Sequence, residues 1–444
     1  MEQFIVQGGI PLKGEVRASG NKNAALKIIP ACLLTEEPVI IHNVPNIGDV
    51  QTIIDIMRQL GSEVRWVDDR TVYIQTKEIV TSEIDPILAS RVRASIVFAG
   101  PMLARHRKIH LPVPGGDSIG ERRLDTHANA MQKLGASVTI QKDRLVMETE
   151  GLVGANILLI ESSVTATENT IMAAVLAKGT TIIRNAASEP HIQDLCIMLN
   201  TLGAQIEGVG TNQLHISGVE KLHGGEVKVG ADYMEVGSYI GAAAMTGGEL
   251  LIKDANPRYL EMVELTFARL GVWWENRGED IFVPSLQPLV IVPDIGNRMP
   301  IIKAQPWPAF PPDLMSIALV IATQCSGSVL FHDWMYESRF FFTDKLIRMG
   351  ARIILCDPHR VLVQGPTTLR GQSSITSPDI RAGMAILLAA LAAKGETRIS
   401  NVRQIDRGYD HVDDKLRELG AKIERVSDLS DEIDKMQEAH HIDR

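Results

Sequence analysis

Apolar and polar residues follow one pattern that repeats along the whole chain. A Leu-Gly or Met-Gly pair, followed by a run in which apolar and polar residues alternate, occurs six times at intervals of 68 to 79 residues. Glycine adopts the left-handed conformation that ends a helix, and the alternation predicts a strand with one buried face. The six pairs are Leu60-Gly61, Leu134-Gly135, Leu202-Gly203, Leu270-Gly271, Met349-Gly350 and Leu419-Gly420.

Two further features complete the repeated unit. A short apolar strand closes on Asn or Asp 16 to 18 residues before five of the pairs, which leaves room for a turn and a helix of three to four turns. Before such strands lie helices of small apolar residues, which we expect to be buried on every side. The closing residues are Asn43, Asn185, Asp254, Asp333 and Asn401, and the apolar helices include 23–34, 170–177, 239–245 and 381–393. The sequence therefore predicts an α/β protein with six repeats of a βαβαββ-type unit, each with one inner and one outer helix.

The second unit departs from this pattern in residues 112–123, which are rich in glycine and charge. Such a departure is either a tolerated loop insertion or a functional element. Glycines let the backbone approach a ligand, and the adjacent Arg122 and Arg123 suit phosphate, which a guanidinium binds through two parallel hydrogen bonds. The alternative interpretation is a solvated surface loop.

Other cations stand where helices begin. Lys22 precedes the first buried helix, where its charge adds to free backbone N–H groups, although a lysine in a turn is usually only solvated. Arg93 and Arg381 head two further apolar helices against the helix dipole, so a bound anion would explain their placement. Arg407 follows a strand end. Asp313 lies in a proline-rich turn, and on the sequence alone a helix N-cap is its favoured interpretation.

Composition excludes several classes of function. The 54 acidic and 45 basic residues give a net charge of -9, and aromatic residues make up 5% of the chain, which together argue against nucleic-acid binding. The apolar runs are shorter than the ~20 residues that span a membrane. The N-terminus lacks the features of a signal peptide, and the four cysteines form no CxxC pair. We therefore expect a cytoplasmic protein with reduced thiols and no metal site.

Seven segments together resemble the enolpyruvyl transferases, and among these the UDP-N-acetylglucosamine 1-carboxyvinyltransferases. The resemblance extends from the first residue to about Arg425. The segments are SGNKNAAL at 19–26, RAS at 93–95, GGDSIGER at 115–122, FPPD at 310–313, ESRF at 337–340, DIRA at 379–382 and IDRGY at 405–409.

The resemblance implies a two-lobed inside-out α/β barrel, with three units per lobe and the active site in the cleft between the lobes. Residues 1–21 plus 233–425 would form the C-terminal lobe, which carries the catalytic base. Residues 22–232 would form the N-terminal lobe with the 112–123 loop, and residues 426–444 a charged tail. The six units derived from the repeat agree independently with three per lobe.

The resemblance also assigns site residues. Lys22, Arg122 and Arg407 match the clamp on the phosphate of phosphoenolpyruvate, with Asn23 beside it. Arg339 and Arg381 match arginines that line the cleft. The residues that match stretches holding the uridine, diphosphate and amino sugar are Arg93, Arg122, Arg123, Leu124, Asp125, Thr126, Glu161, Ser162, Ser163, Val164, Asp313 and Met335. Several converging cations suit phosphoenolpyruvate, because it carries both a carboxylate and a phosphate.

The implied reaction transfers the enolpyruvyl group of phosphoenolpyruvate to the 3-hydroxyl of UDP-N-acetylglucosamine by addition and elimination, releasing phosphate. It is the first committed step of peptidoglycan precursor synthesis. Asp313 resembles the base that takes the hydroxyl proton and later helps to remove the methyl proton. Asp117 stands where the family most often has a catalytic cysteine, and a carboxyl can also donate a proton when its environment disfavours ionisation. Without the thiolate, we expect resistance to fosfomycin, an epoxide that alkylates the cysteine.

Two alternatives stay open at the level of sequence. A related enolpyruvyl transferase acts on shikimate 3-phosphate, although such relatives have Gly-Ser-Lys-Ser where this chain has Gly20-Asn21-Lys22-Asn23. The other alternative is a catalytically silent scaffold with the same fold. The joint presence of Lys22, Asp117, Arg122, Asp313 and Arg407 argues against it. The resemblance implies no cofactor, no metal, no nucleic acid, no membrane and no obligate protein partner.

Overall fold

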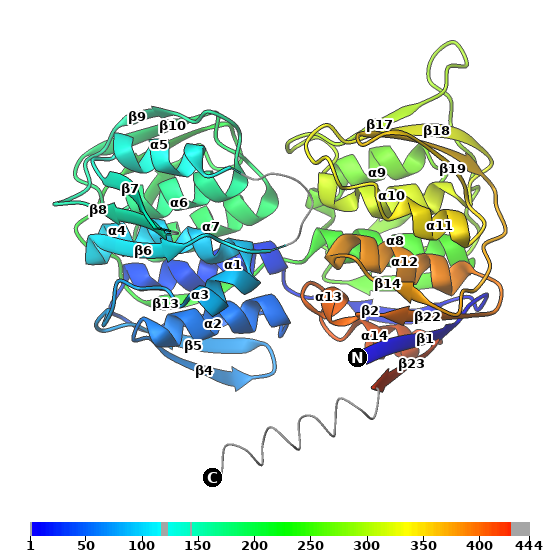
Figure 1. The fold of residues 1–444 in the computed structure, drawn as a ribbon, viewed down its shortest axis with the longest axis horizontal. Helices are drawn as coiled ribbons and strands as arrows, with labels where there is room; N and C mark the ends of the chain where they lie inside the picture. Colours follow the sequence, from blue (N-terminus) through cyan, green and yellow to red (C-terminus); the bar gives the residue numbers. More distant parts are fainter. Residues whose placement is uncertain (1, 117–122, 143, 428–444) are drawn as a thin grey trace, which may run out of the picture. The chain divides into compact units, whose positions relative to one another are not determined.

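The computed structural model describes residues 2–116, 123–142 and 144–427, and the chain divides into two units (Figure 1). The N-terminal unit comprises Ser19–Asp232 and Pro306–Pro308. The C-terminal unit comprises Met1–Ala18, Tyr233–Gln305 and Ala309–Arg444. Asp117 and Arg122 lie outside the described residues, as do residues 428–444 of the predicted tail.

The described residues form six sheets, three in each unit, as the six sequence repeats predict. In five sheets a parallel edge strand is followed by three antiparallel strands, with the orders β13-β3-β5-β4, β9-β10-β12-β11, β2-β14-β16-β15, β17-β18-β20-β19 and β21-β22-β1-β23. The sixth, β6-β8-β7, has an isolated parallel bridge between Glu83 and His110 in place of the edge strand. The fold is thus mixed α/β with one sheet per repeat.

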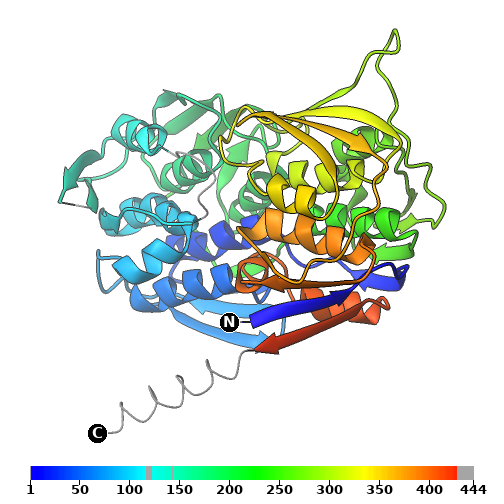
Figure 2. The same ribbon diagram turned by 45° about the vertical axis from the view of Figure 1, so that its right-hand side comes forward.

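The strands of the N-terminal unit are β3 (Val39–His42), β4 (Glu63–Asp68), β5 (Thr71–Gln75), β6 (Lys108–Pro112), β7 (Ser137–Gln141), β8 (Arg144–Glu148), β9 (Asn156–Leu158), β10 (Thr180–Arg184), β11 (Gln205–Glu207), β12 (Gln213–Ser217) and β13 (Gly225–Lys228). The strands of the C-terminal unit are β1 (Glu2–Gln7), β2 (Lys13–Arg17), β14 (Glu249–Lys253), β15 (Glu275–Arg277), β16 (Asp280–Val283), β17 (Ile301–Lys303), β18 (Gly327–His332), β19 (Arg352–Asp357), β20 (Arg360–Gly365), β21 (Ile375–Thr376), β22 (Glu396–Ser400) and β23 (Lys422–Ser427). The first strand of the chain, β1, lies between β22 and the last strand, β23 (Figure 2).

Apolar helices fill the interior of each unit, because side chains that are apolar on every face must be covered on every face. In the C-terminal unit α8 (Tyr233–Thr246), α10 (Met315–Ala322) and α12 (Ile380–Ala392) pack against one another and are almost entirely buried. In the N-terminal unit α1 (Lys22–Ala31), α4 (Ala99–His106), α6 (Val164–Ala174) and the 3-10 helix η2 (Arg93–Phe98) take this place. The other α-helices of the described residues are α2 (Gly48–Gln59), α3 (Pro86–Arg91), α5 (Asp125–Lys133), α7 (Pro190–Thr201), α9 (Glu261–Ala268), α11 (Thr343–Arg348), α13 (Arg403–Asp406) and α14 (Val412–Glu418).

The residues that define the repeat have specific backbone conformations. All six glycines of the Leu-Gly and Met-Gly pairs have positive φ, from +70° to +103°, as the helix-ending interpretation requires. Four of the five strand-closing residues also have positive φ, between 52° and 59°: Asn43, Asn185, Asp254 and Asn401. The three asparagines donate a side-chain hydrogen bond to the carbonyl that follows the parallel edge strand, at Val229, Leu159 and Ser377 respectively. Asparagine tolerates the left-handed region and can make this bond, which explains its recurrence.

Two inner helices begin earlier than the sequence pattern predicts. The expected helix 239–245 is α8, which already begins at Tyr233. The expected helix 170–177 is α6, which runs from Val164 to Ala174 because its first turns carry buried polar residues. Ser163 caps the helix by accepting a hydrogen bond from the Ala166 amide, and the Thr167 hydroxyl donates to the Ser163 carbonyl. These local bonds satisfy polar groups that an apolar pattern does not detect.

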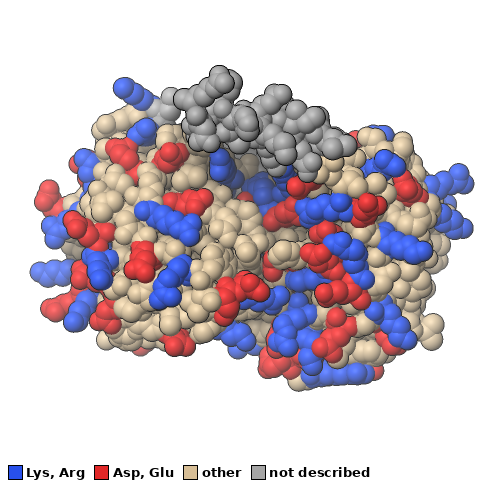
Figure 3. Space-filling model, turned by 90° about the horizontal axis from the view of Figure 1, so that it is seen from below, with Lys and Arg blue, Asp and Glu red and all other residues tan. Residues whose placement is uncertain are grey.

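The surface carries charges of both signs. On the face shown in Figure 3, Lys and Arg side chains are interspersed with Asp and Glu, and the chain has 45 basic and 54 acidic residues in all. In the described part of the chain, no helix combines the length and the apolar character needed to cross a membrane.

Candidate active site

Lys22 is the first residue of α1 and is almost fully buried. Its ammonium group lies 2.8 Å from Asp49 Oδ2 on α2, and its backbone N–H donates to Asp232 Oδ2 over 3.2 Å. The side chain of Asn21 caps the helix through the Ala24 amide at 3.0 Å. Lys22 is therefore a fixed cation at a helix N-terminus, with the half-buried Asn23 next to it, an arrangement suited to an anion.

The two segments predicted to hold a nucleotide lie close together in the N-terminal unit. The Thr126 hydroxyl on α5 is 3.5 Å from Glu161 Oε1, just before α6, and α5 packs against α6. Arg123 and Asp125 form an exposed ion pair of 3.1 Å, while Ser163 and Val164 begin α6. Arg93 starts η2, and its guanidinium lies 3.5 Å from the carbonyl oxygen of Pro114, at the edge of the 112–123 loop. The structure thus connects these segments through neighbouring elements, with Leu124 and Ser162 half-buried among them.

A buried histidine holds the start of α5 in place. His127 Nε2 lies 3.0 Å from the Thr165 hydroxyl, and His127 Nδ1 lies 2.9 Å from the amide nitrogen of Asn169. Asn169 also accepts from the Gly100 amide and donates to the Ile96 carbonyl, so its orientation is fixed. Its NH2 group can only donate, which assigns the proton of the neutral imidazole to Nε2. Burial, together with the charge of Arg93, lowers the pKa of His127 to about 3.

We expect His127 to make stability depend on pH. An ordinary histidine has a pKa of 6.5 and takes up a proton in the unfolded chain as pH falls below that value, whereas the folded state with its pKa of about 3 does not. Its contribution to the free energy of unfolding is therefore complete above pH 6.5 and declines by up to about 1.4 kcal/mol per pH unit toward pH 3. Urea unfolding between pH 4 and 7 measures this slope. His127→Gln should reduce it by about one proton, whereas the exposed control His223→Gln should leave it unchanged; equal slopes for wild type and His127→Gln would contradict the assignment.

Asp313 lies at the centre of an ion cluster in the C-terminal unit. Its carboxylate is 3.1 Å from Arg339 Nη2 and 3.3 Å from Arg381 Nε. Arg339 is also 3.7 Å from the buried Asp333, whose pKa is raised by burial and lowered in part by Arg339. The Asp313 side chain remains 30% exposed, whereas those of Arg339 and Arg381 are 4% and 6% exposed. Two buried cations thus hold a carboxylate that is open to a reactant.

The N-cap interpretation of Asp313 is wrong. The 3-10 helix η4 (Pro312–Leu314) has Pro311 at its N-cap position and Leu314 precedes α10, so Asp313 caps neither helix. Guanidinium groups are charged donors and bind a carboxylate more strongly than a neutral backbone N–H does. Sequence reasoning weighed only the local donors, whereas both arginines come from distant segments.

Met335 is linked to this cluster by a hydrogen bond to Asp333, and Arg407 is close in sequence to Tyr409, which contacts Arg381. The backbone N–H of Met335 donates to Asp333 Oδ1 at 2.9 Å, and the same aspartate pairs with Arg339. The Arg381 guanidinium lies over the ring of Tyr409 at 5.4 Å, and Arg407 precedes this tyrosine by two residues. The Arg407 Nη1 donates to Gln404 Oε1 at 2.8 Å. The C-terminal unit therefore brings together Asp313, Arg339, Arg381 and Met335, with Arg407 on an adjoining turn.

Three acidic residues and one histidine of these clusters were missed at the level of sequence. Asp49, in the first turn of α2, has the appearance of a residue that compensates the helix dipole. Asp232 lies shortly after β13, Asp333 follows β18 directly and was predicted only as a strand-closing residue, and His127 is one polar residue on an amphipathic helix. Among the described residues, no group of three or more His, Cys, Asp or Glu side chains is arranged to bind a metal ion.

Comparison with known proteins shows the family and the fold of the chain. The family model for EPSP synthase (3-phosphoshikimate 1-carboxyvinyltransferase) matches residues 6–425. Relatives named UDP-N-acetylglucosamine 1-carboxyvinyltransferase include those of Treponema denticola, 52% identical over 96% of this chain and 99% of the relative, and Borreliella burgdorferi, 51% identical over the same shares. The enolpyruvyl transferase NikO from Streptomyces tendae shares the fold with a TM-score of 0.85, at 22% identity over 96% of this chain and 99% of that one. An EPSP synthase from Acinetobacter baumannii has a TM-score of 0.74 at 16% identity, over 96% and 100% of the two chains.

Proposed function

The chain belongs to the EPSP synthase family, and we propose that it transfers the enolpyruvyl group of phosphoenolpyruvate to the 3-hydroxyl of UDP-N-acetylglucosamine, with release of phosphate. The observation that carries this proposal is the identity of 51–52% with relatives that bear this activity in their name, over almost the full length of both chains. The EPSP synthases of known structure share the fold at 16–17% identity. The protein is accordingly a transferase of peptidoglycan precursor synthesis.

The ion cluster of the C-terminal unit supports the role of Asp313 as the base. Nearby guanidinium groups favour the charged form of a carboxylate, so Arg339 and Arg381 keep Asp313 able to accept a proton. In the first step the 3-hydroxyl oxygen bonds to C2 of phosphoenolpyruvate, Asp313 takes the hydroxyl proton, and C3 gains a proton from Asp117. In the second step the C2–O bond to phosphate breaks and the departing phosphate takes up the proton that Asp313 holds. The freed Asp313 carboxylate helps to remove a proton from C3, and the electrons of that C–H bond form the double bond between C2 and C3. Asp313 then releases its proton to solvent, and Asp117 regains one.

The fixed cations support the binding of phosphoenolpyruvate. We assign its phosphate to Lys22, Arg122 and Arg407, with Asn23 beside them. Lys22 is held by Asp49 and the helix cap before any substrate arrives, so little ordering entropy remains to be lost on binding. We assign the nucleotide sugar to the connected segments of the N-terminal unit, that is, Arg93, residues 122–126 and residues 161–164, together with Asp313 and Met335.

We also place the reaction in the cytoplasm. The four cysteines are free. Thiols in this state are typical of a reducing compartment.

An acceptor comparison tests the proposal. The purified protein is incubated with phosphoenolpyruvate and either UDP-N-acetylglucosamine or shikimate 3-phosphate, and released phosphate is measured. Release with UDP-N-acetylglucosamine alone is the expected result. Release with shikimate 3-phosphate alone would replace the proposal by the other acceptor, and release with neither would favour a silent scaffold.

A further inference from the structure

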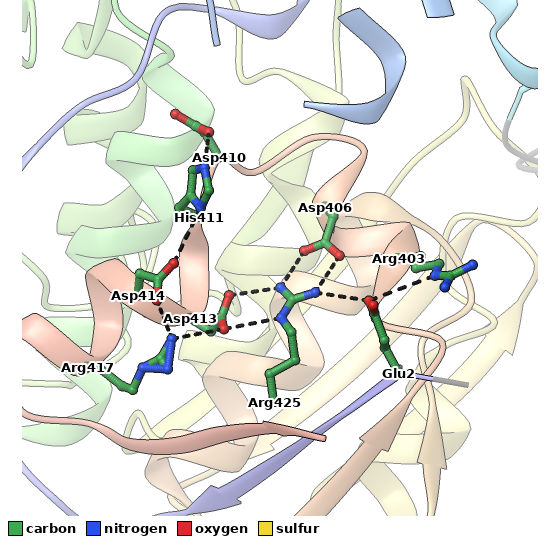
Figure 4. A network of polar contacts seen from close by, with 9 residues as sticks. All are labelled: Glu2, Arg403, Asp406, Asp410, His411, Asp413, Asp414, Arg417 and Arg425. Atoms are coloured by element: carbon green, nitrogen blue, oxygen red, sulfur yellow. Dashed lines mark hydrogen bonds and ion pairs between the residues drawn. The ribbon is translucent and has the colours of Figure 1, made fainter. Parts of the chain in front are cut away.

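A network of charged side chains surrounds Arg425 in the last strand, β23, outside the residues assigned to substrate (Figure 4). Its guanidinium donates to Asp406 through both terminal nitrogens, Nη1 to Oδ2 and Nη2 to Oδ1, each at 2.8 Å. It also donates to Asp413 from Nε at 3.2 Å and from Nη2 at 2.8 Å, and to Glu2 from Nη1 at 3.2 Å. These five hydrogen bonds use all five N–H groups of an arginine.

The flat face of the Arg425 guanidinium contacts an aromatic ring, in addition to the hydrogen bonds that its N–H groups make. It lies over the ring of Phe4 at 4.8 Å, and Phe4 on β1 is fully buried. The two strands are antiparallel neighbours, with Phe4 directly opposite Arg425. Arg425 is therefore a rigid group that belongs to the sheet, and its carboxylate partners are positioned by it.

One of these partners is adjacent to a residue of the phosphate clamp. Asp406 is the last residue of α13, and Arg407 follows it at the C-cap. A helix of four residues has too few internal hydrogen bonds to hold itself in place. An acidic residue at a helix C-terminus also opposes the helix dipole, so Asp406 needs the compensation that Arg425 provides.

We infer that Arg425 is a positioning residue for phosphoenolpyruvate: by gripping Asp406 through two parallel hydrogen bonds, it fixes the turn that carries Arg407. This inference rests on the proposed function. The side chains of Val402 and Ile405 are fully buried and hold the turn against the core. Arg425 restricts the rotation that these apolar contacts still allow the turn. Since Arg425 is 30% exposed, its ion pairs contribute modestly to overall stability, and its loss should loosen the turn without unfolding the protein.

The chain offers closely matched controls. Arg403 lies on α13 itself and pairs with Glu2 at 3.8 Å, and Arg417 on α14 pairs with Asp413 at 3.2 Å and with Asp414. Both belong to the network in Figure 4, and the contacts named for them are to carboxylates other than Asp406. If the loss of any charge in the network were enough to weaken substrate binding, substitution of Arg403 or Arg417 would have the same effect as substitution of Arg425.

The test measures KM and kcat for both substrates in Arg425→Met, Arg425→Lys, Asp406→Asn, Arg403→Met and Arg417→Met. We expect Arg425→Met and Asp406→Asn to raise the KM for phosphoenolpyruvate about tenfold or more, with the KM for the acceptor changed less than about twofold, because a small misplacement of Arg407 weakens one substrate alone. Arg425→Lys should not rescue, since an ammonium cannot form the two parallel bonds. Arg403→Met and Arg417→Met should resemble wild type.

A second measurement is independent of turnover. Hydrogen exchange of the peptide that spans 402–409 should be faster in Arg425→Met and unchanged in Arg417→Met. Unchanged exchange, a similar rise in both KM values, or the same selective rise in Arg403→Met would overturn the inference. If wild type uses another acceptor, the proposed function fails, but the KM for phosphoenolpyruvate is then measured with that acceptor and still decides the role of Arg425.

Discussion

Asp313→Asn is expected to lower the rate of phosphate release by about 10²- to 10⁴-fold while UDP-N-acetylglucosamine still binds, because the amide keeps the shape of the side chain but cannot accept the proton. The loss should appear in kcat as well as in kcat/KM, since the proton is transferred in the reaction rather than on binding. Rapid measurement of phosphate release gives the rate, and calorimetric titration gives the dissociation constant of the nucleotide sugar.

The control for this experiment is a carboxylate–arginine pair on the surface of the same unit. Asp357 lies 2.6 Å from Arg360 at the turn between β19 and β20, so Asp357→Asn removes a comparable ion pair and should retain activity. Thermal unfolding of both variants shows whether loss of charge beside the buried Arg339 and Arg381 has altered the fold. A normal rate in Asp313→Asn would show that the base is another group. Loss of both the rate and nucleotide binding would limit Asp313 to its role in binding the nucleotide sugar and leave the base unassigned.

The repeat is the part of the fold that the sequence predicts best, because its marks are local. Gly61 and its five counterparts end helices, and Asn43, Asn185 and Asn401 close strands, through backbone conformations that few residue types adopt. Each mark is a backbone conformation that one residue type favours, so counting the marks yields six repeats without knowledge of how the repeats pack. The start of α6 escaped this reasoning because its polar residues are satisfied by bonds within one turn or to another helix.

The partners of the site residues could not be predicted in the same way. Lys22 meets Asp232 across 210 positions of sequence, and Arg425 meets Glu2 across 423. Such pairs depend on how strands and helices are arranged in space, and the spacing of apolar and polar residues along the chain does not predict that arrangement. Asp313 illustrates the consequence, since the local pattern favoured a helix cap while the contacts that define the residue come from Arg339 and Arg381. The resemblance to a family placed these residues in one site, and the structure supplies the contacts within each unit.

The wild-type enzyme is expected to resist covalent inactivation by fosfomycin. Alkylation by an epoxide requires a thiolate, and Asp117 offers a carboxylate at the position where the resemblance in sequence implies a cysteine. Three of the four cysteines are poor targets, because Cys32, Cys196 and Cys325 are buried and burial raises the pKa of each thiol. Cys356 is exposed on β19, outside the residues assigned to substrate, so an adduct there should not stop turnover. Preincubation with fosfomycin and UDP-N-acetylglucosamine, followed by dilution and assay, measures the effect. Time-dependent loss of activity with a mass adduct would contradict the expectation.

Asp117→Cys should reverse this resistance, raising the rate of inactivation by roughly 10²-fold or more as a thiolate is placed in the substrate site. Turnover should persist, because a thiol can replace the carboxyl as the proton donor, whereas Asp117→Asn can donate no proton and should lose about 10²-fold or more in kcat. The double variant Asp117→Cys with Cys356→Ser should be inactivated as fast as the single variant, which assigns the adduct to position 117. If Asp117→Cys turns over yet stays resistant, residue 117 does not face the substrates, and the proton for C3 must come from another group.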